Sequence, residues 1–225
     1  MTSETEVRAL SQAHVDAWPP DDTEESVVGT DLHQETITNL RLGITEAAQL
    51  CREEGTSPPW KVLSQTMLLG CLRPDGSAYR TLPDIFVYRH PVDRTRPSVA
   101  LTTDGPPVLI LEVLSASTYD SDLDIERGKG FSYAKAGVRE YLALDPTATM
   151  VPEGGRGWRL AEGGYRPWNR DADDRWSSEE IGVAFGFEGI MATVYTVEGR
   201  RIFRAGEVET EIDELRRRLR AATGE

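Results

Sequence analysis

The spacing of apolar and polar residues predicts an α/β order of helices and strands. Apolar residues recur three and four positions apart from Asp31 to about Glu54, which is typical of a helix lying on a sheet. Strands are predicted at residues 60–70 and 83–88, and the proline-rich stretch 90–107 between the later elements reads as a loop. The stripe of the first helix consists of Ile37, Leu40, Ile44, Ala47 and Cys51.

Residues 108–114, with the sequence VLILEVL, are the most strand-like part of the chain. Their continuous apolar character predicts a central strand buried on both faces. A helix is expected over about 122–136, ending at Gly137, and a strand over 140–144 follows it. A strand, a helix and a strand in this order predict a βαβ crossover.

After Pro146 the chain becomes turn-rich, with short pieces that carry exposed-looking tryptophans. This texture predicts a β-meander appended to the core, with strands near 183–187 and 192–195. A final helix begins after Gly206, and we expect its apolar stripe to cover the core, the alternative being a second subunit. The stripe is Val208, Ile212, Leu215 and Leu219.

The predicted organisation is one structural domain in three parts. Residues 1–25 form a polar lead-in, residues 26–146 an α/β core, and residues 147–225 a β-rich extension with a terminal helix. The length of 225 residues suits a single domain with extensions.

Composition narrows the class of protein. Apolar residues make up 39% and charged residues 28% of the chain, which is a globular composition. No apolar run approaches the roughly 20 residues of a transmembrane helix, and the N-terminus lacks the pattern of a signal peptide. We therefore expect a cytoplasmic protein in which Cys51 and Cys71 are reduced core residues.

The net charge of −13 argues against a surface that attracts DNA everywhere. A local basic groove is compatible with that total. Its candidate residues are Arg80, Arg89, Arg94, Arg127, Lys129 and Lys135.

Glu112 is the chemical anomaly of the sequence, since it interrupts the apolar central strand. A buried carboxylate is costly unless it is paired or bound to a metal. Asp84 follows Pro83 at the head of another predicted strand, so the two carboxylates converge if the strands are neighbours. Two such oxygen ligands suit Mg²⁺, which binds few carboxylates and keeps several waters. The alternative for Glu112 is a position at the end of a strand, where its side chain reaches solvent or an arginine. The alternative for Asp84 is a residue of a Pro-Asp turn.

Lys129 is the third candidate. It lies on the helix predicted after the Glu112 strand, between Gly128 and Gly130. Glycine is unfavourable within a helix by about 1 kcal/mol relative to alanine, so this pair indicates a close approach of the backbone. A lysine near a metal can stabilise charge that develops on a phosphate. The alternative is a solvated surface lysine.

Three segments together resemble the Uma-two family, whose members are classed with restriction endonucleases of the PD-(D/E)XK nuclease superfamily. They are Pro83-Asp84, the ILEVLSAST run at 110–118, and Lys129 followed by the YAKAGVREY run at 133–141. The resemblance covers about residues 25–145. It implies a restriction-endonuclease-like core, a mixed β-sheet flanked by helices.

The resemblance also implies roles for individual residues. Asp84 and Glu112 would be ligands of Mg²⁺, with Mn²⁺ as a substitute, and Lys129 would join them in catalysis. Leu114 stands where the superfamily usually has a lysine, so the family pattern places that role on Lys129. Supporting roles fall to Ser115, Asp124 and Tyr133, and His33 occupies the place of a family histidine that lines the site.

The implied activity is hydrolysis of phosphodiester bonds in DNA by a Mg²⁺-dependent endonuclease, which would act as a homodimer. Two alternatives stay open. One is a non-catalytic module on the same fold that binds nucleic acid or protein. The other is a hydrolase of small phosphate compounds, which would suit an acidic surface better than long DNA.

Overall fold

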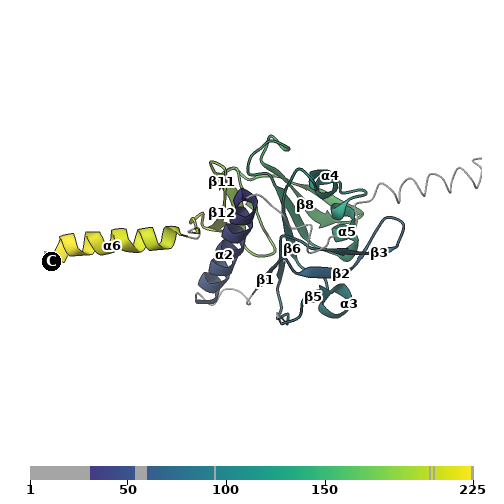
Figure 1. Ribbon diagram of the computed structural model, residues 1–225, viewed down its shortest axis with the longest axis horizontal. Coiled ribbons are helices and arrows are strands. Elements are labelled where there is room, and N and C mark those ends of the chain that lie inside the picture. The colour runs from purple at the N-terminus through teal and green to yellow at the C-terminus, as the bar shows by residue number, and fades with distance from the viewer. Residues whose placement is uncertain (1–30, 54–59, 94, 203, 205, 224–225) are drawn as a thin grey trace, which may run out of the picture.

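The computed structural model describes residues 31–53, 60–93, 95–202, 204 and 206–223 (Figure 1). The predicted lead-in at 1–25 lies outside these residues. A six-stranded sheet forms the centre. In spatial order its strands are β1 (Lys61–Ser64), β4 (Ile85–Tyr88), β6 (Leu109–Val113), β7 (Glu140–Leu144), β8 (Gly155–Ala161) and β9 (Gly164–Trp168).

The central sheet is mixed. Strands β6 and β7 run parallel, and the other neighbours are antiparallel. All five residues of β6 are buried, as the continuous apolar run predicted. The crossover from β6 to β7 and the strand at 140–144 are also confirmed, so β6 stands between β4 and β7.

Two smaller sheets flank the centre. One contains β3 (Ala78–Thr81), β2 (Met67–Leu72) and β5 (Ser98–Ala100), and the other β10 (Trp176–Ser177), β11 (Val183–Glu188) and β12 (Met191–Thr196). The strands predicted near 183–187 and 192–195 are therefore confirmed. Strands β8 and β9 instead extend the main sheet beyond β7. The tryptophans of this region are buried rather than exposed, namely Trp158, Trp168 and Trp176.

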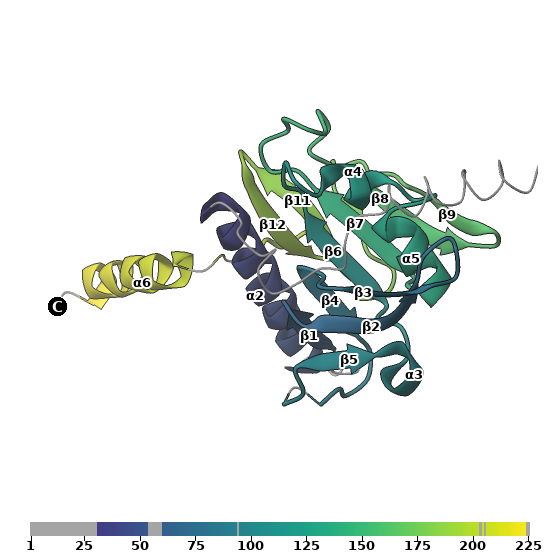
Figure 2. The same cartoon turned by 45° about the vertical axis from the view of Figure 1, so that its right-hand side comes forward.

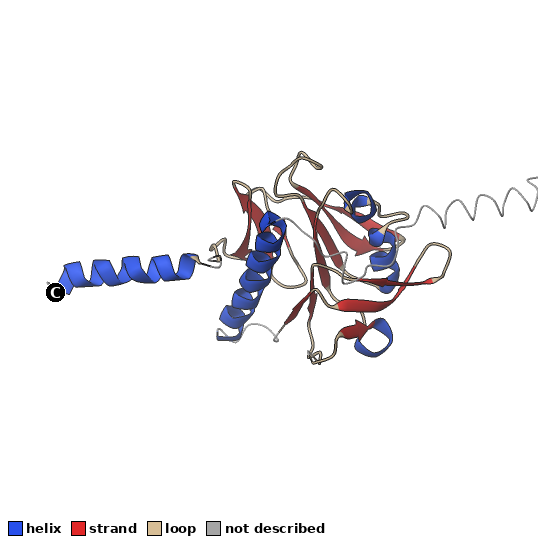
Figure 3. Cartoon of the chain, viewed as in Figure 1, coloured by secondary structure: helices blue, strands red, loops and turns tan. Residues whose placement is uncertain are grey.

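Helices lie on both faces of the main sheet (Figures 2 and 3). Helix α2 (Asp31–Glu53) packs on one face, together with the β10–β12 sheet. Helices α4 (Tyr119–Leu123) and α5 (Lys129–Ala136) cover the other face. Because side chains alternate along a strand, Ile110, Glu112 and Leu114 point towards the α5 side.

The prediction for α2 is confirmed, and Ile37, Leu40, Ile44 and Ala47 are buried in the core. The side chain of Cys51 lies outside the described residues. Cys71 is buried and free, and burial raises the pKa of its thiol to about 12. Within the described residues, no helix is long and apolar enough to span a membrane.

Two predictions for residues 60–107 are wrong. The single strand at 60–70 is two strands in different sheets, since Gln65 adopts a left-handed φ of 48° between β1 and β2. The expected loop at 90–107 contains β5 and a short helix, α3 (Leu101–Asp104). Strand β5 is held because it pairs in parallel with β2, a long-range contact that local sequence does not reveal.

The single helix expected over 122–136 is also wrong, since α4 ends at Leu123 and α5 begins at Lys129. Asp124 Oδ1 accepts bonds from the backbone N–H groups of Glu126 (2.9 Å) and Arg127 (2.8 Å), which forms a turn. The close approach predicted from the glycines is confirmed. A Cβ at Gly128 would lie 2.1 Å from the carbonyl oxygen of Ser121, and the turn can fold back on α4 only without it.

The terminal helix, α6 (Glu207–Thr223), does not cover the core as expected. It projects away from the body of the protein (Figures 1 and 3). Ile212, Leu215 and Leu219 are 41%, 52% and 64% exposed. The side chain of Val208 lies outside the described residues.

Gly128→Ala should destabilise the fold by about 3 kcal/mol, because the added methyl group would overlap backbone atoms that cannot move independently. The free energy of unfolding from urea denaturation measures this loss. Gly163→Ala is the control, since Gly163 has a positive φ of 87° but open space around it. That change should cost only the backbone strain of about 1 kcal/mol. Equal losses in the two variants would contradict the steric explanation.

Candidate active site

Two carboxylates meet where β4 and β6 lie side by side. Asp84 immediately precedes β4, and Glu112 is the fourth residue of β6. The Asp84 backbone N–H donates to Glu112 Oε2 (3.3 Å), and Val113 N–H donates to Asp84 Oδ2 (2.7 Å). The predicted convergence of Asp84 and Glu112 is therefore confirmed, and the backbone fixes both carboxylates.

Glu112 is enclosed by polar groups from α5. The Tyr133 hydroxyl donates to Glu112 Oε1 at 2.6 Å, and Lys129 Nζ lies 3.4 Å from the same oxygen. Thr81 Oγ1 lies 3.1 Å from the Tyr133 hydroxyl. These partners replace the water that a buried carboxylate loses, and Glu112 is only 2% exposed.

A third carboxylate, that of the buried Asp122 from α4, completes the cluster. Lys129 Nζ lies 3.2 Å from Asp122 Oδ1, so the ammonium group sits between Asp122 and Glu112. Lys129 can take this position because α5 begins at Lys129 itself, directly after the turn at Gly128. We name Asp84, Glu112, Asp122, Lys129 and Tyr133 the acidic cluster.

Negative charge exceeds positive charge in the acidic cluster. Burial raises the pKa of Glu112 well above its ordinary value of 4.5, and the charges of Asp84 and Asp122 raise it further against the opposing effect of Lys129. Burial likewise raises the pKa of Asp122, again opposed by Lys129. Three carboxylates with one lysine form a place where an added cation would be stabilised.

The cluster reaches solvent on the side of His33. His33 Nε2, from the first turn of α2, lies 3.6 Å from Asp84 Oδ1, and the two side chains are 14% and 15% exposed. The side chains of Glu112 and Lys129 are only 3% and 6% exposed. Asp84 is therefore the carboxylate nearest to an incoming ligand, and His33 lies where the family resemblance placed it.

Asp84 and Glu112 are the residues that could hold a metal ion. Their adjacent carboxylates offer oxygen donors, which suit Mg²⁺ together with several waters. Among the residues that the structure describes, no group of three or more histidine, cysteine or acidic side chains could hold a metal ion. Two carboxylate donors leave the remaining coordination positions of Mg²⁺ to water and substrate.

The supporting residues proposed from the sequence divide into two groups. Tyr133 joins the acidic cluster. Ser115 and Asp124 do not: Ser115 Oγ pairs with Ser117 Oγ (3.1 Å) and Thr118 Oγ1 (3.0 Å), and Asp124 holds the turn before α5. Asp122 was missed, since the sequence does not distinguish it from the neighbouring Asp120 and Asp124. Only the orientation of α4 shows which of them is buried.

The basic residues considered for a groove lie in different surroundings. Lys129 is turned inward, while Arg80, Arg127 and Lys135 are exposed. Arg89 Nη1 lies 3.6 Å from Glu180 Oε2 at the surface. Arg94 lies outside the described residues. Exposed positive charge therefore occurs on β3 and at α5, the elements that flank the acidic cluster.

The main sheet is mixed and has helices on both faces, and Asp84 and Glu112 stand at two neighbouring strands. This arrangement defines a restriction-endonuclease-like protein. Residues 24–192 match the model of the Uma2 family, whose description is "Putative restriction endonuclease". The match covers well over half of the chain, so the chain belongs to the Uma2 family. No curated protein sequence matches it.

The raised pKa of Glu112 predicts a pH dependence of stability in metal-free buffer. Between its ordinary pKa of 4.5 and the higher folded-state pKa, the native state binds the proton more tightly than the unfolded state. The contribution of Glu112 is thus complete below 4.5 and is lost as the pH rises through the folded value.

Glu112→Gln removes this titration while keeping a similar shape. Relative to this variant, the wild type should lose free energy of unfolding as the pH rises above 4.5. Urea denaturation at a series of pH values makes the comparison. Two parallel stability curves would show that Glu112 titrates normally in the fold.

Proposed function

We propose that this protein is a Mg²⁺-dependent endonuclease that hydrolyses phosphodiester bonds in DNA. The observation that carries the proposal is the meeting of Asp84, Glu112 and Lys129 in one cluster. These residues come from three separate segments of the chain. A structural protein would gain stability from an apolar residue at position 112.

In this proposal Asp84 and Glu112 hold the metal, with Mn²⁺ able to replace Mg²⁺. A bound Mg²⁺ supplies Lewis acidity towards a phosphate oxygen and lowers the pKa of water. The chain's own groups hold the ligands still. Val113 N–H fixes the Asp84 carboxylate, and the Tyr133 hydroxyl fixes that of Glu112. Rigid ligands favour the transition state because no reorganisation is needed during the reaction.

Lys129 contributes the positive charge of the site. Its ammonium group lies beside Glu112, where it can stabilise negative charge that develops on the phosphate. Asp122 positions the ammonium group from the opposite side. The lysine of this site therefore comes from the start of α5 rather than from the position two residues after Glu112, where Leu114 stands.

DNA is the proposed substrate because the chain belongs to a family described in terms of restriction endonucleases. Because the net charge of the chain is −13, binding of DNA would depend on local positive charge. Exposed Arg80 on β3, Lys135 on α5 and Arg127 in the turn before α5 carry such charge. The alternative substrate is a small phosphate compound, which an acidic surface would repel less than it repels long DNA.

The proposal predicts that the wild type nicks supercoiled plasmid in Mg²⁺ or Mn²⁺ and is inactive in EDTA. Asp84→Asn and Glu112→Gln should each lower the rate by at least about 100-fold, since each removes a metal ligand. Lys129→Met should also lower the rate, because it removes the charge that would stabilise the phosphate, while calorimetry should still detect Mn²⁺ binding.

Glu140→Gln is the matched control, because Glu140 is also a buried strand carboxylate and pairs with Arg159 at 3.2 Å. It should retain nicking activity. Equal activity of the wild type and Glu112→Gln would contradict the assignment. A wild type that cleaves a small phosphodiester but no plasmid would move the substrate class to small phosphate compounds. Lack of both activities and of metal binding would favour the non-catalytic module.

A further inference from the structure

Helix α6 presents an apolar face to solvent. It extends from the body of the protein as a separate arm (Figure 1). Ile212, Leu215 and Leu219 are three of the seven large apolar side chains that are exposed in the described part of the chain. Most of the stability of a helix in a protein comes from packing of its amphipathic face, so a partner on this face would stabilise α6.

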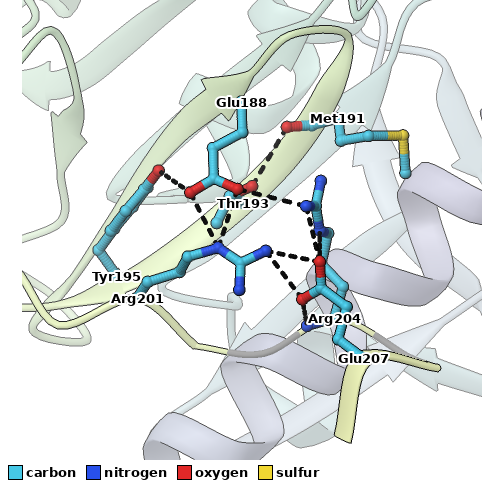
Figure 4. Close-up of polar contacts among 7 residues, drawn as sticks. All are labelled: Glu188, Met191, Thr193, Tyr195, Arg201, Arg204 and Glu207. Carbon is cyan, nitrogen blue, oxygen red and sulfur yellow. Dashed lines mark hydrogen bonds and ion pairs between the residues drawn. The ribbon is translucent and has the colours of Figure 1, made fainter. Parts of the chain in front are cut away.

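The base of α6 is fixed to the β10–β12 sheet by four charged residues (Figure 4). Arg201 Nε lies 2.8 Å from Glu188 Oε1, and Arg201 Nη2 lies 2.6 Å from Glu207 Oε1. Arg204 Nη2 lies 3.2 Å from Glu188 Oε2 and 2.7 Å from Glu207 Oε1. Burial alone would raise the pKa of Glu207, yet the bonds from Arg201 and Arg204 hold it at about 2. The first turn of α6 is thus fixed, which directs the rest of the helix outward.

The apolar positions of α6 follow the spacing of a two-stranded coiled coil. Along the sequence they fall at 208, 212, 215 and 219, with steps of four, three and four. This is the a/d repeat that forms a narrow seam between two helices. A helix covering a broad core would carry a wider apolar face than these single positions supply.

The charges of α6 identify the partner. Five of the eight residues at 207–214 are acidic, and four of the five residues at 216–220 are arginines. Arg216 and Arg218 make exposed ion pairs within the helix, with Asp213 (3.2 Å) and Glu214 (2.5 Å). A second α6 lying antiparallel would place its basic half against the acidic half of the first. A parallel copy would place like charges together and align the two helix dipoles unfavourably.

We propose that α6 is a dimerisation helix that pairs with α6 of a second copy of this chain in antiparallel orientation. Ile212 packs against Leu215 of the second copy, and Leu219 of the second copy lies opposite position 208 in this register. The same pair of contacts occurs twice, because the interface is symmetric. The charge halves of the two helices then face each other along the seam.

Light scattering on the full chain tests the dimer. The wild type should have twice the mass of one 25.0 kDa chain at micromolar concentration. Leu215→Asp with Leu219→Asp should give a monomer that still unfolds cooperatively on heating, because both residues are exposed and neither belongs to the buried core. Thr210→Asp, a charge added at another exposed position of α6, is the control and should stay dimeric.

Cysteine cross-linking tests the orientation. An oxidised mixture of Val208→Cys and Leu219→Cys chains, distinguished by size tags, should form the mixed disulfide. Leu219→Cys alone should not form one, since the two sulfur atoms would lie about 16 Å apart along the seam. The unsubstituted chain controls for Cys51 and Cys71.

Three outcomes would overturn the proposal. The first is a monomeric wild type, including one that sediments with vesicles of phosphatidylcholine and phosphatidylserine and so binds lipid instead. The second is a dimer that survives the double Asp substitution, which would place the interface elsewhere. The third is efficient cross-linking of Leu219→Cys with itself, which would show a parallel pair.

Discussion

The burial of one carboxylate in the central strand constrains the surrounding structure. Glu112 lies in β6, between β4 and β7, with apolar residues on either side of it along the strand. Taking a carboxylate out of water is costly unless other groups replace its hydration. Its partners therefore come from separate segments: Tyr133 and Lys129 from α5, and the backbone N–H of Asp84 from the start of β4. The Glu112 carboxylate has all of these polar partners only when each of the segments is in place.

The break between α4 and α5 follows from the same constraint. A continuous helix through this region would not begin at Lys129, and it would not bring Asp122 of α4 against the lysine. Gly128 permits the break because its missing side chain leaves room for the carbonyl oxygen of Ser121. The resulting ion pairs of Lys129 with Glu112 and Asp122 join the crossover connection to the sheet. Local backbone chemistry thus sets the electrostatics of the candidate site.

The sequence predicted the features that depend on local patterns or on recognisable motifs. The apolar run around Glu112, the stripe of α2 and the spacing of Asp84, Glu112 and Lys129 all led to correct elements or contacts. Features that depend on long-range contacts could not be predicted in this way. Strand β5 exists only through its pairing with β2, and Asp122 is distinguished from Asp120 and Asp124 only by burial. The exposed position of α6 was also missed, because an amphipathic stripe has the same pattern whether it meets a core or a second chain.

The central claim is that Asp84 and Glu112 together form a site for a divalent cation. Anomalous diffraction from crystals soaked in Mn²⁺ tests it most directly, because the signal locates the metal without reference to activity. The account predicts a peak within about 2.5 Å of a carboxylate oxygen of each residue, and its loss in Glu112→Gln crystals. A peak at other residues, or one that persists unchanged in Glu112→Gln, would contradict the account.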